Sequence, residues 1–110
     1  MYAIGIDLGG TFIAGGIANG DGRLLCRRSV PTGAERGPEE IVRDMAGMCR
    51  GMAAELGVGC EDIEYIGIAA PGAVDPGRGM ILRAENIHFK DYPICRALYM
   101  AIGEKAPVYI

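Results

Sequence analysis

The sequence predicts an α/β fold in which a mixed sheet of about five strands carries helices on its faces. The first 30 residues contain three short, largely apolar segments joined by tight turns, a pattern typical of an antiparallel meander. An amphipathic helical pattern follows, and further apolar segments come after it. Because a strand that follows a helix favours a parallel crossover, the expected sheet combines both strand directions.

The three segments of the meander are separated by clear turn signals. The first strand is expected over residues 2–7 (YAIGID) and the second over residues 12–18 (FIAGGIA). Only residues 8–11 separate them, which leaves room for a turn alone. The NGDG sequence at 19–22 predicts a second turn, because glycine and asparagine tolerate the positive φ of tight hairpins. Residues 23–30 (RLLCRRSV) complete the meander.

One amphipathic helix is expected over residues 38–56, before Gly57. Pro38 suits the first turn of a helix. Apolar side chains then recur at steps of three and four residues: Ile41, Val42, Met45, Met48, Cys49, Met52 and Leu56. Residues 63–70 (IEYIGIAA) are expected to form a buried strand that ends at Pro71, since proline cannot donate to a strand ladder.

The last third of the chain contains shorter elements. Residues 74–82 (VDPGRGMIL) are expected to form a turn with extended pieces on either side. A short helix is expected over residues 93–102, and APVYI at 106–110 begins another apolar strand. In this arrangement Asp7 lies at the carboxyl end of the first strand, where open α/β sheets leave a crevice for ligands.

Length and charge exclude several classes of protein. A chain of 110 residues forms one domain at most. No apolar run approaches the roughly 18 residues of a membrane span, and the N-terminus lacks the pattern of a secretory signal, so a cytoplasmic protein without membrane contact is expected. The net charge of -3 and the scattered basic residues give no footprint for nucleic acid. A small or phosphorylated ligand fits better.

The cysteines are expected to be structural. Cys26, Cys49, Cys60 and Cys95 show no CxxC spacing, and His88, the only histidine, is near none of them in the sequence. A zinc site within this chain is therefore not expected. Scattered thiols in a cytosolic protein most often behave as small buried hydrophobes.

The motif at residues 7–11 (DLGGT) has the composition of a phosphate-binding turn. Without Cβ atoms, Gly9 and Gly10 can bring backbone N–H groups against a phosphate, and the Thr11 hydroxyl adds a donor. Asp7 would then hold Mg²⁺ through water, because this ion keeps several waters and takes few carboxylates. The alternative is an ordinary hairpin whose turn is Gly-Gly, with Asp7 capping it. Neither the GxxxxGK[ST] nor the GxGxxG phosphate loop is present.

Two motifs together resemble one family. GIDLGGT at 5–11 and GIAAPGAVD at 67–75 are similar to the start of the ROK family sugar kinases, especially their bacterial glucokinases. The similarity extends through GRGMILRAENI at 77–87 to APVYI at the C-terminus. It implies a ribonuclease H-like lobe of the actin-like ATPase superfamily, whose members bind ATP between two lobes. The first motif is shared across that superfamily, whereas the second is more specific.

The resemblance also implies roles for individual residues. Asp7, Gly9, Gly10 and Thr11 would face the β- and γ-phosphates of ATP and Mg²⁺, while Gly72 and Asn86 would line the hexose site. An amide both donates and accepts, as a sugar hydroxyl demands. The alternative for Asn86 is a loop residue that bonds to backbone. Phe12 departs from the family, which commonly has a polar residue there, and Pro71 is expected only to shape its turn.

Two further polar residues have simpler interpretations. Asp75 precedes Pro76 and is expected to form a turn, and His88 is expected to lie in a surface loop rather than to act as a base. The resemblance implies that this chain contains no catalytic residue. In the family, the aspartate that acts as general base on the sugar lies in a segment that would follow Ile110, as do a cysteine-rich zinc segment and the lobe that holds adenine.

The sequence is thus interpreted as residues 1–110 of an ATP-dependent hexose kinase, most specifically a glucokinase, comprising the N-terminal lobe without the C-terminal one. Apolar contacts left exposed by the missing half favour a homo-oligomer. Two alternatives stay open: the lobe of a sugar-responsive ROK transcriptional regulator, and a noncatalytic sugar- or nucleotide-binding module. Regulators of this family have a helix-turn-helix ahead of the fold, for which a first strand at Tyr2 leaves no room.

Overall fold

The computed structural model describes all 110 residues, and its main sheet has five strands in the order β3-β2-β1-β4-β8. Their bounds are β1 (Tyr2–Leu8), β2 (Phe12–Ala18), β3 (Leu24–Pro31), β4 (Ile63–Ala69) and β8 (Val108–Tyr109). The first three strands are antiparallel, and β1-β4 and β4-β8 are parallel pairs. The predicted mixed sheet is confirmed.

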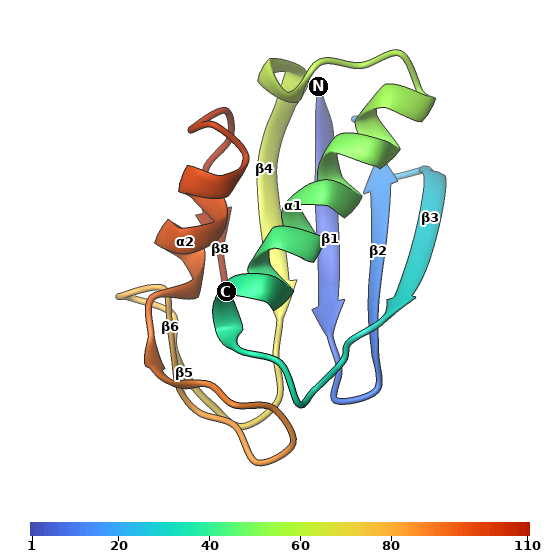
Figure 1. Ribbon diagram of the computed structural model, residues 1–110. Helices are drawn as coiled ribbons and strands as arrows, with labels where there is room; N and C mark the ends of the chain where they lie inside the picture. The colour runs from blue at the N-terminus through green and yellow to red at the C-terminus, as the bar shows by residue number, and fades with distance from the viewer.

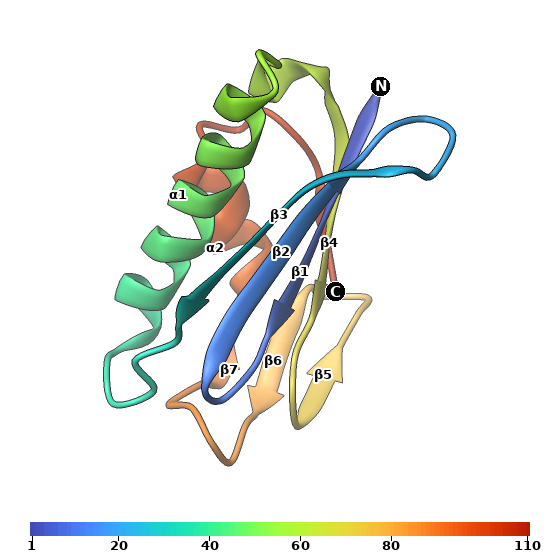
Figure 2. The same cartoon turned by 90° about the vertical axis from the view of Figure 1, so that its right-hand side faces the viewer.

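Both helices cover the same face of this sheet (Figure 2). α1 (Pro38–Glu55) begins at a proline, as predicted, and lies diagonally over the strands in Figure 1. Its buried side includes the predicted residues Ile41, Met45, Met48 and Met52. α2 (Ile94–Ala101) packs beside α1, and its buried residues include Ile94 and Leu98. The expectation of helices on the faces of the sheet therefore holds for one face only, and the other face is open.

The alternation of side chains along β1 separates the two faces. Ile4, Ile6 and Leu8 are buried beneath the helices, whereas Gly5 and Asp7 are exposed on the opposite side. β2 and β4 repeat the pattern, with isoleucines toward the helices and mostly Gly and Ala on the open side. Asp7 therefore reaches solvent at the carboxyl end of β1 because its neighbours are committed to the core.

A second, smaller sheet was not predicted. It contains three antiparallel strands, β5 (Ala73–Asp75), β6 (Met80–Arg83) and β7 (Lys90–Tyr92). The extended pieces expected around the 74–82 turn are β5 and β6, but nothing in the sequence indicated β7. The sheet lies at the end of the molecule where β1 and β4 finish, as Figures 1 and 2 both show.

Boundaries of the predicted elements agree with the structure to within about two residues, the usual uncertainty of helix ends. A 3-10 turn, η1 (Cys60–Asp62), precedes β4. Neither helix of the structure has the length and apolar character needed to cross a membrane.

The packing of α1 predicts which side-chain truncations destabilise the fold. Met45 is fully buried under the sheet, whereas Met100 on α2 is 50% exposed. Met45→Ala should lower the free energy of unfolding by about 2 to 5 kcal/mol, because it leaves a cavity in the core. The matched change Met100→Ala should cost less than about 0.5 kcal/mol. Urea unfolding monitored by circular dichroism measures both, and equal effects would contradict the packing described here.

Candidate functional site

The Asp7–Thr11 segment forms the turn between β1 and β2. The N–H of Gly9 donates to the carbonyl oxygen of Phe12 at 3.0 Å and closes the turn. The N–H groups of Gly10 and Thr11 donate to no backbone carbonyl. Two adjacent donors are thus available to an anion, as the phosphate interpretation requires.

The two glycines of this turn are needed by its geometry. A Cβ on Gly9 would lie 2.7 Å from the carbonyl oxygen of Phe12, and a Cβ on Gly10 would lie 3.0 Å from the Cβ of Asn86. The first contact belongs to the hairpin itself and fits the ordinary-hairpin alternative as well. The second joins the turn to a loop 76 residues further along the chain, which an ordinary hairpin does not require.

The structure therefore brings together two groups of residues that are far apart in the sequence. Asn86 is exposed in the loop between β6 and β7 and packs its side chain over Gly10. Gly72 lies beside the other end of that loop, since a Cβ there would overlap the carbonyl oxygen of Arg83. With φ at +82°, Gly72 also has a backbone conformation that other residues rarely adopt. Asp7, Gly10, Gly72 and Asn86 thus gather at the carboxyl ends of β1 and β4.

Asp75 and His88 are not included in this candidate site. Arg78 donates to both carboxylate oxygens of Asp75, from its backbone N at 3.2 Å and its side-chain Nε at 2.8 Å. These bonds lower the pKa of Asp75, and they engage its carboxylate in the turn. His88 is exposed in the β6–β7 loop, the position expected for it.

Sequence reasoning missed Thr32, which contacts the turn from behind. Its hydroxyl donates to the Gly9 carbonyl at 2.7 Å, and its backbone N–H donates to the Thr11 carbonyl at 2.8 Å. No motif marks this residue, which simply follows the last residue of β3. Only the pairing of β3 with β2 places it beside the turn.

The donor set at the turn fits a water-mediated Mg²⁺ site and not a tightly bound transition metal. Asp7 is exposed and belongs to none of the four ion pairs, so its oxygens are available. No group of three His, Cys, Asp or Glu side chains surrounds it or any other point of the structure. A single carboxylate at a phosphate turn is what a hydrated Mg²⁺ ion needs from the protein.

The cysteines lie apart from this site. Cys26, Cys49 and Cys95 are buried, and all four thiols are free. Burial raises the pKa of Cys49 to about 12 and also raises that of Cys95. These two thiols therefore stay protonated at neutral pH, as the structural interpretation expects.

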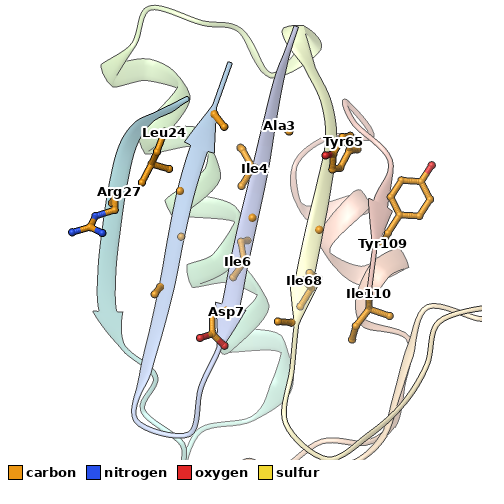
Figure 3. Close-up of a pocket in the computed structure, with 17 residues that line it drawn as sticks. Ala3, Ile4, Ile6, Asp7, Leu24, Arg27, Tyr65, Ile68, Tyr109 and Ile110 are labelled. Atoms are coloured by element: carbon orange, nitrogen blue, oxygen red, sulfur yellow. The ribbon is translucent and has the colours of Figure 1, made fainter. Parts of the chain in front are cut away.

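A broad hollow of about 730 Å³ covers the open face of the sheet (Figure 3). Its floor consists mainly of small residues of β1, β2 and β4, with Tyr65 and Tyr109 at one side. Asp7 and Arg27 are its only charged lining residues, and Figure 3 places them far apart. The hollow lacks the convergent polar groups of a site for a polar ligand. Asp7 lies where the hollow meets the β1–β2 turn.

Comparison with known proteins identifies the family. The model of the ROK family matches residues 3–110. The glucokinase of Thermotoga maritima is 31% identical over 106 residues, which are 96% of this chain and 32% of that enzyme. An N-acetylmannosamine kinase of Escherichia fergusonii is 28% identical over 79% of this chain and 28% of its own length. A putative xylose repressor of Caldicellulosiruptor is 29% identical over 97% of this chain and 26% of its own.

Solved structures give the same fold. A ROK hexokinase from Thermus thermophilus superposes with a TM-score of 0.81 at 38% identity, covering 98% of this chain and 34% of that one. A ROK family glucokinase from Streptomyces griseus, solved in complex with glucose and AMPPNP, has a TM-score of 0.85 at 33% identity, covering all of this chain and 32% of that one. This chain thus spans about a third of the length of these proteins.

The contact between Gly10 and Asn86 can be tested directly. Gly10→Ala should displace Asn86, because a Cβ at 3.0 Å is closer than ordinary van der Waals contact. The side-chain NH₂ resonances of Asn86 in a ¹⁵N-correlated spectrum should therefore shift. Gly47→Ala is the matched control, since nothing lies within 4 Å of a Cβ at that helical position. Unshifted Asn86 resonances in the Gly10 variant would mean that the two segments do not touch.

Proposed function

This chain belongs to the ROK family, and we propose on that basis that residues 1–110 form the N-terminal lobe of an ATP-dependent hexose kinase. We propose that its sugar is glucose and its product glucose 6-phosphate. The remaining lobe would hold adenine and supply the general base, in a segment that follows Ile110. The zinc segment known in the family would also belong to that part.

The observation that best supports this proposal is the contact between the residue assigned to the sugar and the turn assigned to phosphate. Asn86, assigned to the sugar, packs on Gly10, assigned to phosphate, so closely that a Cβ added to Gly10 would lie 3.0 Å from the Asn86 Cβ. Phosphoryl transfer needs the sugar hydroxyl and the γ-phosphate within near-attack distance. Placing a site for each on the same edge of the sheet is consistent with that need. A relative of known structure holds glucose and AMPPNP together, which supports the same pair of substrates.

In the proposed reaction the turn binds the phosphates of ATP. The Gly10 and Thr11 N–H groups would donate to phosphate oxygens, where negative charge accumulates during transfer. Asp7 would hold hydrated Mg²⁺ through its free carboxylate oxygens. The ion, when bound, neutralises charge on the β- and γ-phosphates. These groups belong to one short hairpin, so their spacing is set before ATP arrives.

The sugar would be held by the edge formed from Gly72 and Asn86. The Asn86 amide can accept from one sugar hydroxyl and donate to another. The backbone at Gly72 is accessible because the residue is exposed and has no side chain. Most of the hydrogen bonds that distinguish glucose from its epimers would come from residues beyond Ile110.

Two alternatives to a glucokinase correspond to other members of the family. The similarity to an N-acetylmannosamine kinase makes that amino sugar the second substrate to assay, and the similarity to a putative xylose repressor makes a regulator the second function. A regulator would bind a sugar without consuming ATP. Turnover of ATP in the presence of a sugar separates these possibilities.

The proposal predicts different activities for the full-length protein and for the isolated chain. A coupled assay of ADP release should detect sugar-dependent turnover with the full-length protein, glucose and Mg-ATP. Residues 1–110 alone should give none, because general-base assistance is worth about 10² to 10⁴-fold and half of the nucleotide site is lacking. If the full-length protein consumes no ATP with any hexose, the kinase proposal is wrong. If the isolated chain turns over within tenfold of it, the general base lies within residues 1–110.

Removal of the Asp7 charge should affect transfer and not sugar binding. Asp7→Asn in the full-length protein should lower kcat by about 10²-fold or more, since the charge on the transferring group is then less well neutralised. The dissociation constant for glucose, measured by calorimetry, should change little. Asp21→Asn is the matched control, because Asp21 lies in the β2–β3 turn at the opposite end of the sheet. Unchanged kcat in the Asp7 variant would remove Asp7 from the site.

A further inference from the structure

Thr32 is the only buried polar residue of the chain, and it lies directly behind the phosphate turn. Its side chain has no exposed surface. The hydroxyl donates to the Gly9 carbonyl at 2.7 Å, and the backbone N–H donates to the Thr11 carbonyl at 2.8 Å. One residue therefore holds the carbonyl groups on both sides of Gly10.

These two bonds fix the direction of the turn's N–H donors. All peptide bonds of the chain are trans, and in a trans peptide the C=O and N–H groups point in opposite directions. The Gly9 carbonyl shares its peptide plane with the Gly10 N–H. Because Thr32 holds that carbonyl, the Gly10 N–H is turned away from Thr32. The Thr11 carbonyl is held on the same side, which restrains the peptide plane between Thr11 and Phe12.

Thr32 is itself held in place from α1. Its carbonyl accepts a hydrogen bond from Arg36 Nη2 at 2.7 Å, and the same nitrogen pairs with Asp44 Oδ2 at 2.7 Å. Asp44 belongs to α1, which packs on the sheet. A continuous series of hydrogen bonds therefore runs from the helix through Arg36 and Thr32 to the Gly9 carbonyl.

We propose that Thr32 is a positioning residue for phosphate binding: its hydroxyl holds the Gly9–Gly10 peptide so that the Gly10 N–H faces the β-phosphate side of the nucleotide site. The inference rests on the proposed function, because it needs a nucleotide at the turn. Thr32 touches no phosphate itself and acts through the Gly9 carbonyl. Its effect should therefore depend on how many phosphates the nucleotide has.

The test compares ADP and AMP binding to the full-length protein by calorimetry. Thr32→Val keeps the branched shape and removes the hydroxyl, whereas Thr32→Ser keeps the hydroxyl. Thr32→Val should weaken ADP binding by about five- to tenfold, the range of one lost hydrogen bond, and should leave AMP and glucose binding unchanged. Thr32→Ser should bind ADP within about twofold of the wild type. A residue needed only for folding would not distinguish ADP from AMP.

A second variant covers the case in which Thr32→Val does not fold. Arg36→Gln leaves Thr32 in place but releases its carbonyl from α1, so it should weaken ADP binding relative to AMP in the same direction by a smaller factor. An unchanged ratio of ADP to AMP affinity in the folded variants would overturn the role of Thr32 while leaving the kinase proposal intact. Failure of the wild-type protein to bind either ADP or ATP would overturn both.

Discussion

The parallel pairing of β1 with β4 is the constraint on which the site depends. Six residue pairs from Tyr2–Ile63 to Asp7–Ala69 align the two strands, so their carboxyl ends finish at the same edge. The β1 strand then turns back through Gly9–Thr11, while β4 continues past Pro71 into the second sheet. Any polar group that follows either strand is delivered to this edge. That is why a turn near residue 10 and a loop near residue 86 can meet.

The alternation of side chains along β1 determines on which face of the sheet Asp7 lies. Ile4, Ile6 and Leu8 are buried in the core under α1. Because side chains alternate along a strand, Asp7 lies on the open face. A register shift of one residue would bury the carboxylate beneath the helices, at a high cost in free energy. The same hydrophobic contacts that stabilise the sheet therefore also place the charge at the end of the strand.

Local patterns in the sequence were sufficient for the main sheet and α1, because each rests on a short-range signal. The meander follows from apolar segments separated by turn residues, and α1 from apolar steps of three and four residues after Pro38. β7 gave no such signal: its residues, Lys90–Tyr92, are largely exposed, and they pair only because the chain returns beside β6. The position of both helices on one face is likewise a tertiary fact that no local pattern contains.

The residues of the candidate site also differ in how far the sequence alone could identify them. Asp7 and the two glycines were proposed from the sequence because a carboxylate and adjacent glycines at the end of an apolar strand have the composition of a phosphate-binding turn, and this role stays a prediction. Gly72 and Asn86 came from resemblance to a family, since neither has a distinctive local pattern. Thr32 could not be found by either route. Its importance lies in two hydrogen bonds to a turn more than 20 residues earlier, which exist only once β3 pairs with β2.

The open face of the sheet and the β1–β2 turn offer different groups to a ligand, and this difference supports the turn as the proposed site. The hollow on the open face is apolar and shallow, and Gly5 faces Gly16 and Gly67 across its three central strands. Such a surface suits close packing of an apolar segment but offers no donors for a phosphate. The turn provides the N–H groups of Gly10 and Thr11 and the Asp7 carboxylate, and Asn86 packs against Gly10. Charge that develops during the proposed phosphoryl transfer would be met there by groups already held in place, which is why we propose the reaction at the strand ends rather than over the sheet.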